Sequence, residues 1–185
     1  MRSALYNKRV IESFLILALL LLALFFLLPY LRSGTKHGAP FVPMEQEVVG
    51  RVMKLAEVGP GKTFYDLGSG DGRLVIAAAM RGAKAVGVEI DTIRVLYSRF
   101  WLRILGLSNA QIIKGNLFEQ DLQDADIVSL YLLEETNKKL RPKLEKELKP
   151  GTLVIATGFK IPGWKPIKID PKGTAYGPIY LYKKQ

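Results

Sequence analysis

The distribution of apolar residues divides the chain into an N-terminal segment and a longer mixed region. Residues 10–31 contain a single charge, Glu12, and the stretch from Phe14 to Leu28 is an unbroken apolar run. At about 1.5 Å per residue, 22 helical residues reach about 33 Å, which spans a bilayer core, whereas the 15-residue run alone does not. The pattern therefore predicts one N-terminal transmembrane helix, so that residues 1–31 form a membrane anchor.

Short apolar runs alternate with amphipathic segments in the rest of the chain. Residues 32–40 are rich in Gly, Ser and Thr and end in Pro, which predicts a linker. Apolar residues at helical spacing predict helices over Met44–Ala56, Arg73–Arg81 and Thr92–Leu105. Predicted strands are Thr63–Leu67, Ala85–Glu89, Gln111–Lys114, Asp126–Tyr131 and Thr152–Thr157. This alternation predicts right-handed crossovers and a parallel sheet in a domain of residues 41–185, with ligands at the carboxyl ends of the strands.

Pro142 interrupts the helical segment that follows the fourth predicted strand. Because proline suits the first turn of a helix, we expect the segment to be divided there, with a second helix over Pro142–Leu148.

A glycine-rich turn, Phe64-Tyr-Asp-Leu-Gly-Ser-Gly-Asp-Gly72, follows the first predicted strand. Glycine lets a backbone approach a ligand and tolerates the positive φ angles of a tight turn. A dinucleotide fingerprint places a third glycine at the position held here by Arg73, so the match to that class is poor. Asp66 at the strand end opposes a pyrophosphate but suits a ligand that carries an ammonium group.

Together with Glu89 at the end of the second strand, this turn resembles motif I of the class I S-adenosylmethionine-dependent methyltransferases. The resemblance implies a Rossmann-like, doubly wound α/β fold with a mostly parallel seven-stranded sheet, closed by an antiparallel pair at Trp164–Ile169 and Pro178–Lys183. It implies S-adenosylmethionine as cofactor and no metal. Asp66 would lie near the methionine amino group, Glu89 would bind the ribose hydroxyls and Asn116 the adenine. The full implied cofactor set is Asp66, Gly68, Ser69, Gly70, Gly72, Glu89, Asn116 and Leu117.

A narrower resemblance rests on several further segments. They are Pro40-Phe-Val-Pro43, Tyr65–Arg73, Lys114–Glu119, Leu140–Gly151 and Pro162-Gly-Trp164. They are similar to the small archaeal protein-lysine methyltransferases and the mitochondrial ATP synthase c-subunit lysine methyltransferase family. The resemblance covers nearly everything from Pro40 onwards, although Met44-Glu45 replaces the usual Thr or Ser and Pro.

The narrower resemblance implies that the methyl acceptor is a lysine of a protein, including a protein of a membrane complex. Tyr131, Glu134 and Glu135, just past the fourth strand, are candidates for orienting that lysine. The two acids are equally compatible with a helix N-terminus, which favours negative charge.

Two other functions are compatible with the same residues. One is methylation of a small molecule or lipid such as an isoprenoid quinone, and the other is a non-enzymatic binding scaffold. The stretch Leu130-Tyr-Leu-Leu133 lacks the Asn/Asp-Pro-Pro-aromatic motif of adenine-N6 and glutamine methyltransferases, which argues against those substrates.

Charge and cleavage signals bear on location. The basic start also fits a secretory signal peptide, but no small-x-small cleavage site follows the apolar run. The positive-inside rule slightly favours a cytoplasmic N-terminus, whereas a cytosolic cofactor favours a catalytic domain on the cytosolic side, which is our expectation. The membrane would be the plasma membrane of a prokaryote or the mitochondrial inner membrane of a eukaryote.

The last part of the chain carries most of the net charge of +10. Residues 138–185 contain 12 basic and 3 acidic side chains, whereas residues 41–137 contain 10 basic and 13 acidic ones. This basic third is suited to an anionic leaflet or forms an ordinary solvated surface. Nucleic-acid binding is less favoured, because no basic motif interleaved with aromatic residues occurs.

Overall fold

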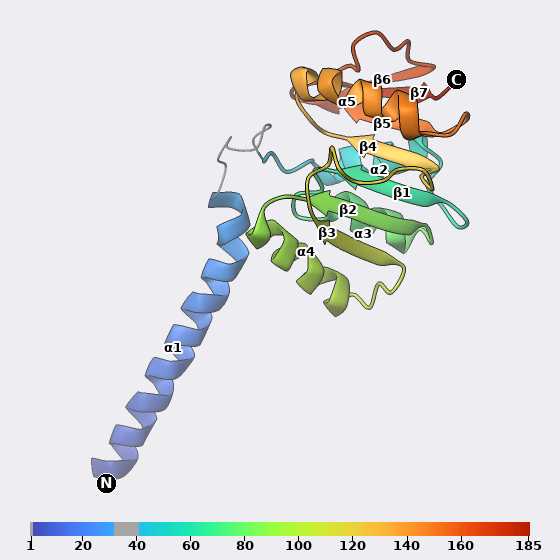
Figure 1. Cartoon of the computed structure of the whole chain (residues 1–185). Coiled ribbons are helices and arrows are strands. Elements are labelled where there is room, and N and C mark those ends of the chain that lie inside the picture. The colour runs from blue at the N-terminus through green and yellow to red at the C-terminus, as the bar shows by residue number, and fades with distance from the viewer. Residues whose placement is uncertain (1, 32–40) are drawn as a thin grey trace.

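A computed structural model of the chain describes residues 2–31 and 41–185, and the side chains of residues 11–29 and 41–185 (Figure 1). The predicted linker at residues 32–40 lies outside the described residues. The helices are α1 (Arg2–Leu31), α2 (Gln46–Leu55), α3 (Arg73–Met80), α4 (Thr92–Ile104) and α5 (Glu134–Glu147). The strands are β1 (Thr63–Leu67), β2 (Lys84–Glu89), β3 (Ala110–Lys114), β4 (Ile127–Leu130), β5 (Leu153–Thr157), β6 (Lys168–Thr174) and β7 (Gly177–Lys183).

The seven strands form one sheet in the order β3-β2-β1-β4-β5-β7-β6. The first five strands of this order are parallel, and β7 is antiparallel to both of its neighbours. The order reverses direction between β1 and β4, which is where an open parallel sheet places its ligands. The predicted α/β fold with a mostly parallel, doubly wound seven-stranded sheet is confirmed.

Helices cover both faces of the sheet. On one face α2, α3 and α4 pack through a cluster that includes Val52, Val75 and Leu102. On the other face α5 packs through Leu140 and Leu144. The central strands are buried along nearly their whole length, as expected for a parallel sheet covered on both sides.

Two predictions about the second half of the chain were wrong. Helix α5 is continuous through Pro142 and is not divided there. Pro142 lies on the exposed face, while Leu140 and Leu144 on either side of it are fully buried. Packing of these two leucines therefore holds the helix together although the proline removes one backbone hydrogen bond.

The outermost strand lies later in the sequence than predicted. We expected it over Trp164–Ile169, but β6 begins at Lys168 and contains Pro171 and Gly173, residues that usually argue against a strand. Because β6 is an edge strand, Pro171 breaks no ladder on its open side. The register against β7 shifts between Asp170 and Thr174, where these two residues lie.

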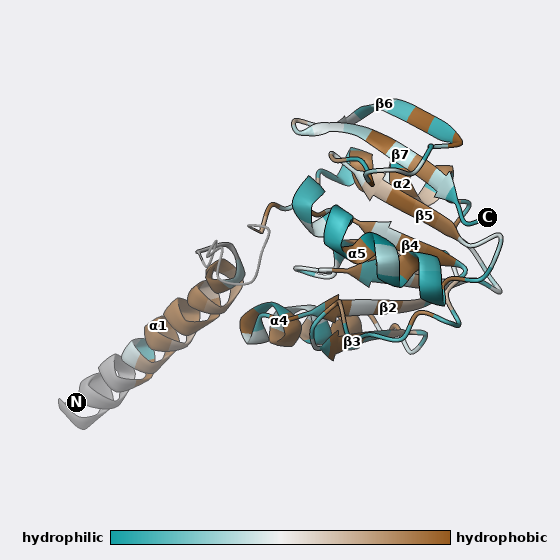
Figure 2. Ribbon diagram, turned by 45° about the horizontal axis from the view of Figure 1, so that its top comes forward, coloured by the Kyte–Doolittle hydropathy of each residue, from teal (hydrophilic) through white to brown (hydrophobic). Residues whose placement is uncertain are grey.

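Helix α1 extends away from the domain and contacts it only near its C-terminal end (Figure 1). Among the described residues, it is the one helix long and apolar enough to cross a membrane, over Ile11–Pro29 with a mean hydropathy of 2.8. Figure 2 shows this apolar surface continuing along the helix.

Candidate functional site

The glycine turn after β1 forms a narrow cradle at the carboxyl edge of the sheet. Gly70 and Gly72 adopt left-handed φ angles of 55° and 82°. A Cβ atom at Gly70 would lie 2.6 Å from the ring of Phe41, and one at Gly72 would lie 2.9 Å from the Cβ of Ser98. The turn therefore needs glycine at both positions, for its backbone conformation and for its space. Gly68, which begins the turn, has a φ angle of 86°.

Asp66 is the buried acid of the site. Its side chain is 3% exposed near the end of β1 and stands in register with Ser129 of β4. Burial raises the pKa of Asp66 to about 7, the neighbouring Ser129 hydroxyl opposes the shift, and the charges of Asp71 and Glu89 add to it. A carboxyl group in this state changes its charge readily near neutral pH, and a cation placed beside it would favour its ionised form.

Glu89 is fixed between the glycine turn and the start of α4. Its Oε2 atom accepts a hydrogen bond from the Gly70 amide (2.9 Å), and its Oε1 atom accepts one from the Asp91 amide (2.8 Å). The Arg94 guanidinium lies 3.9 Å from Oε1. These contacts hold the carboxylate in one orientation beside the turn.

Ser69, Asn116 and Leu117 complete the predicted ligand set. Ser69 is buried in the turn, and its hydroxyl has no hydrogen-bond partner among the described residues. Asn116 follows β3, as predicted. Its side-chain Oδ1 accepts a hydrogen bond from the Phe118 backbone N–H (3.1 Å), and its Nδ2 donates one to the Glu119 carboxylate (3.0 Å). These bonds shape the loop that carries Leu117, which is half-buried.

The candidates for acceptor binding separate in the structure. Tyr131 is half-buried immediately after β4, whereas Glu134 and Glu135 are exposed in the first turn of α5. Burial raises the pKa of Tyr131, the Thr174 hydroxyl lowers it, and the charges of Tyr176 and Glu45 raise it. Tyr131 therefore packs against neighbouring side chains. Glu134 and Glu135 instead lie at the N-terminus of α5, where the helix dipole favours negative charge.

Side chains from other segments gather around Tyr131. Gly158, just after β5, is close enough that a Cβ atom there would contact the Tyr131 ring, the Thr174 hydroxyl and the Tyr176 Cβ at 3.4–3.5 Å. The rings of Phe159 and Tyr176 stack with centroids 6.2 Å apart. We call Tyr131, Phe159, Thr174 and Tyr176 the aromatic entrance.

Sequence reasoning gave no role to three residues that shape the site. The ring of Phe41 lies over the glycine turn and 4.5 Å from the Arg94 guanidinium carbon. Arg94 lies off the apolar stripe that the sequence predicts for its helix, yet it is 8% exposed. A Cβ atom at Gly87 would lie 2.7 Å from the Ser69 hydroxyl, so this glycine lets the turn rest on β2. Of these three residues only Gly87 could have been found from the sequence, because a glycine inside a strand often marks the close approach of another backbone segment.

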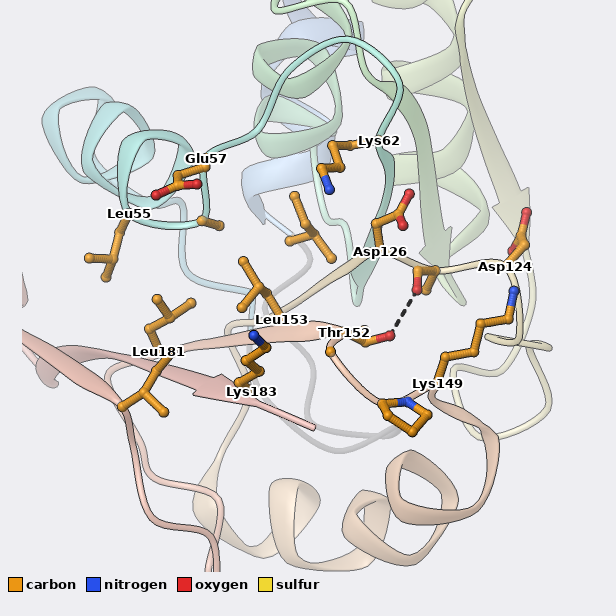
Figure 3. A pocket seen from close by; sticks show the side chains of 16 residues that line it. Leu55, Glu57, Lys62, Asp124, Asp126, Lys149, Thr152, Leu153, Leu181 and Lys183 are labelled. Atoms are coloured by element: carbon orange, nitrogen blue, oxygen red, sulfur yellow. Dashed lines mark hydrogen bonds between the residues drawn. The ribbon is translucent and has the colours of Figure 1, made fainter. Parts of the chain in front are cut away.

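A pocket of about 530 Å³ lies at the opposite edge of the sheet (Figure 3). It opens where β1, β4 and β5 begin, and Lys62, Lys149 and Lys183 line it with Asp126. The Asp126 carboxylate accepts from the Thr63 amide at 2.7 Å. The pocket is therefore separate from the buried acids, and its inner carboxylate supports the backbone.

The residues at the carboxyl edge fit the ligand that the sequence predicts. The glycine turn leaves room for close backbone contact, and Asp66 provides a buried carboxyl group for an ammonium. Glu89 provides an oriented carboxylate that can accept from two hydroxyl groups. The aromatic entrance lies at the ends of β4 and β5, on the same edge.

Comparison with known proteins identifies similar chains. Residues 66–168 match the model of a family described as the ANTKMT methyltransferase domain. A protein-lysine N-methyltransferase of Saccharolobus islandicus is 44% identical over 149 residues, which cover 77% of this chain and 92% of that protein. The human lysine N-methyltransferase of the ATP synthase c-subunit is 34% identical over 149 residues, which cover 80% of this chain but 62% of the human protein.

A solved structure shows the same fold with a bound ligand. An RNA methyltransferase from Salinibacter ruber in complex with S-adenosyl-L-homocysteine superimposes with a TM-score of 0.72 at 39% identity, covering 77% of this chain and 93% of that one. The family match begins at Asp66 and includes Glu89, Asn116 and Tyr131.

Proposed function

The chain belongs to the ANTKMT methyltransferase family and is an S-adenosylmethionine-dependent methyltransferase. We propose that it is anchored in a membrane and that it methylates lysine side chains of proteins. The pair of buried acids beside the glycine turn, Asp66 and Glu89, carries the assignment of the cofactor site. The 44% identity to a protein-lysine N-methyltransferase supports lysine as the acceptor.

We assign the cofactor contacts from the chemistry of each group. The Asp66 carboxylate would pair with the methionine ammonium, and the backbone of Gly68–Gly72 would surround the methionine chain. Glu89 would accept from the two ribose hydroxyls while keeping its bonds to the Gly70 and Asp91 amides, because each carboxylate oxygen has two lone pairs. The loop at Asn116 and Leu117 would hold the adenine.

The aromatic entrance suits a lysine side chain. Tyr131, Phe159 and Tyr176 offer apolar ring faces for the methylene groups of lysine and electron-rich surface for its ammonium. The Tyr131 and Thr174 hydroxyls would accept hydrogen bonds from the amine. Glu45 acts electrostatically on Tyr131 and would attract the cationic side chain to this opening.

The reaction needs a neutral, well-placed amine. When bound, S-adenosylmethionine supplies a methyl group activated by a sulfonium. An amine with a pKa of about 10.4 in water loses its proton more easily where burial disfavours the charged form. Tyr131 and its neighbours would desolvate and align the amine, and alignment alone can lower the barrier by roughly 7 to 11 kcal/mol in the best cases. The proton can leave to solvent before transfer.

We propose that α1 anchors the enzyme as a single span with the catalytic domain on the cytosolic side. The length and apolarity of Ile11–Pro29 support the span. A membrane-bound enzyme would reach lysines of membrane proteins, and the human relative is named for the c-subunit of ATP synthase. The basic residues 138–185 lie around α5, β6 and β7, at the end of the sheet away from α4, and their approach to an anionic leaflet stays a prediction.

Transfer of radiolabelled methyl groups tests the choice of acceptor. The purified full chain is incubated with labelled S-adenosylmethionine and with membranes and soluble extract of its source. We expect label in membrane protein bands, on lysine after acid hydrolysis, and none with the Glu89→Ala variant. The proposal is supported if protease releases the label and neither ribonuclease nor lipid extraction removes it.

The other outcomes correspond to the other acceptors. Label that follows the organic phase would indicate a lipid or quinone substrate, and label removed by ribonuclease would indicate RNA, as in the named activity of the Salinibacter ruber protein. Either result would overturn lysine as the acceptor while leaving the methyltransferase assignment intact.

Variants of the acceptor candidates should differ in their effects. We expect Tyr131→Ala to lower kcat/KM for the protein acceptor about tenfold or more, because it removes a ring and a hydroxyl from the entrance. Cofactor affinity, measured by calorimetry, should change less than about twofold, since the lost contacts concern only the acceptor. The matched controls Glu134→Gln and Glu135→Gln alter exposed charges only, and a large loss of activity in either would contradict this division of roles.

A further inference from the structure

An aromatic cluster joins α1 to α4. Phe25 lies with ring centroids 5.9 Å from Tyr97 and 5.3 Å from Phe100, and Phe26 lies 5.9 Å from Trp101. The cluster lies close to Pro29, where the apolar span ends. Helix α4 is thus at the level of one end of the span, where Trp and Tyr are enriched in membrane proteins.

The surface of α4 continues the apolar surface of α1. Leu96, Phe100 and Ile104 follow one another at intervals of four residues, so they lie on one side of the helix. They are 53%, 37% and 60% exposed, and Leu105 beyond them is 46% exposed. Exposure of an apolar stripe of this length to water is unfavourable. The lipid that would surround the adjoining α1 span could cover it. In Figure 2 the described side chains of α1 are mainly hydrophobic, and α4 carries both hydrophobic and hydrophilic segments.

Two features favour lipid as the covering medium. The stripe is contiguous with the exposed side of α1 through Phe100, which contacts both Phe25 and Phe26. Exposed Arg103 lies beside the stripe on the same helix, and an arginine at the edge of an apolar face can reach lipid phosphates.

We propose that α4 lies in the membrane interface, with the stripe Leu96, Phe100, Ile104 and Leu105 inserted among the lipids, so that the membrane orients the catalytic domain. This inference rests on the proposed span of α1. Helix α4 begins three residues after Glu89, at the end of β2, and Figure 1 shows α1 approaching the domain from this side. The carboxyl edge with the cofactor site therefore faces the bilayer surface, where lysines at the ends of membrane helices would be presented.

The two tryptophans of the chain provide the test. Trp101 belongs to the aromatic cluster, whereas Trp164 packs against Tyr182 and donates to Glu145 on the α5 side of the sheet. Both are half-buried, so they form a matched pair. Full-length Trp164→Phe and Trp101→Phe variants are reconstituted in phosphatidylcholine vesicles with or without brominated acyl chains. We expect brominated lipid to quench Trp101 roughly twofold and to leave Trp164 nearly unchanged.

A further pair of variants separates contact with lipid from proximity to α1. The double variant Leu96→Glu/Ile104→Glu places charges on the stripe outside the aromatic cluster and should reduce the quenching of Trp101. Met80→Glu, at a residue of α3 that is 70% exposed, should leave it unchanged. Equal quenching in the double variant and the parent would overturn insertion of the stripe.

The failure of this inference can be told apart from the failure of the anchor. A Leu20→Trp variant in a background without the other two tryptophans reports on the middle of the span. Quenching of this residue without quenching of Trp101 would leave α1 in the membrane and remove α4 from it. If neither is quenched, the proposed span itself is wrong, and the interface proposal fails with it.

Discussion

The Asp66→Asn variant is expected to be more stable than the parent protein at pH 8 in the absence of cofactor, and to bind S-adenosylmethionine about a hundredfold more weakly. The stability gain follows from burial, which raises the pKa of Asp66 to about 7 from an ordinary value of 3.8. Between these two pH values the folded state binds more protons than the unfolded state, so stability falls as pH rises from about 4 to 7 and is lowest above 7. Asparagine removes this ionisation, and we expect a gain on the order of 2 kcal/mol at pH 8.

The loss of affinity has the same origin. A bound ammonium would favour ionised Asp66, so binding to the parent protein releases a proton near neutral pH, and affinity should rise from pH 5.5 to 8. In the asparagine variant this dependence should disappear together with most of the affinity. Thermal unfolding and titration calorimetry of the full chain in detergent, at pH 5.5, 7 and 8, measure both quantities.

A control at another acid shows that the effect is specific to burial. Asp124→Asn changes a half-exposed carboxylate whose pKa is lowered, so it should reduce stability slightly and leave cofactor affinity unchanged. If Asp66→Asn bound the cofactor as well as the parent does, the assignment of Asp66 to the ammonium would be wrong.

The positions of the central strands and their parallel arrangement could be predicted because local and global signals agree there. Phe64, Tyr65 and Leu67 around Asp66, and Val86–Val88, suit strands buried on both faces, and a glycine turn follows the first of these strands. The edge strand β6 could not be placed, since Pro171 and Gly173 disfavour a strand by local propensity. Long-range contacts hold it, namely its pairing with β7 and the bonds from Arg51 to Asp170 and Lys172. Continuity of α5 through Pro142 likewise depends on the tertiary packing of the leucines beside it.

The site shows the same division between local and long-range information. Asp66, Glu89 and the glycines were identifiable because each lies next to the strand that positions it. The place of Phe41 over the turn depends on a contact across 29 residues, and the Arg94 guanidinium packs against that ring. The packing of Phe25 against α4 joins segments more than 70 residues apart, so an apolar run could predict the span of α1 but not the face of the domain that meets it.

Replacing Gly70 by Ala is expected to lower S-adenosylmethionine affinity at least a hundredfold, with methyl transfer falling in proportion at low cofactor concentration. A left-handed alanine costs about 1 kcal/mol. In addition, the new Cβ atom would lie 2.6 Å from the Phe41 ring, which the Arg94 guanidinium contacts on one face. Relief of this overlap must move the ring or the turn, and moving the turn displaces the Gly70 amide from Glu89, so that the carboxylate is no longer held for the ribose.

Gly61→Ala is the matched control, because Gly61 also has a left-handed φ angle, 76°, while nothing lies within 4 Å of its would-be Cβ. Both variants should lose about 1 kcal/mol of stability from the backbone, but only Gly70→Ala should lose the cofactor. Phe41→Ala combined with Gly70→Ala removes the overlap and should recover part of the affinity. Equal cofactor binding by the Gly61 and Gly70 variants, measured by calorimetry, would show that close approach of the turn to the ligand is not required and would place the cofactor elsewhere on this edge.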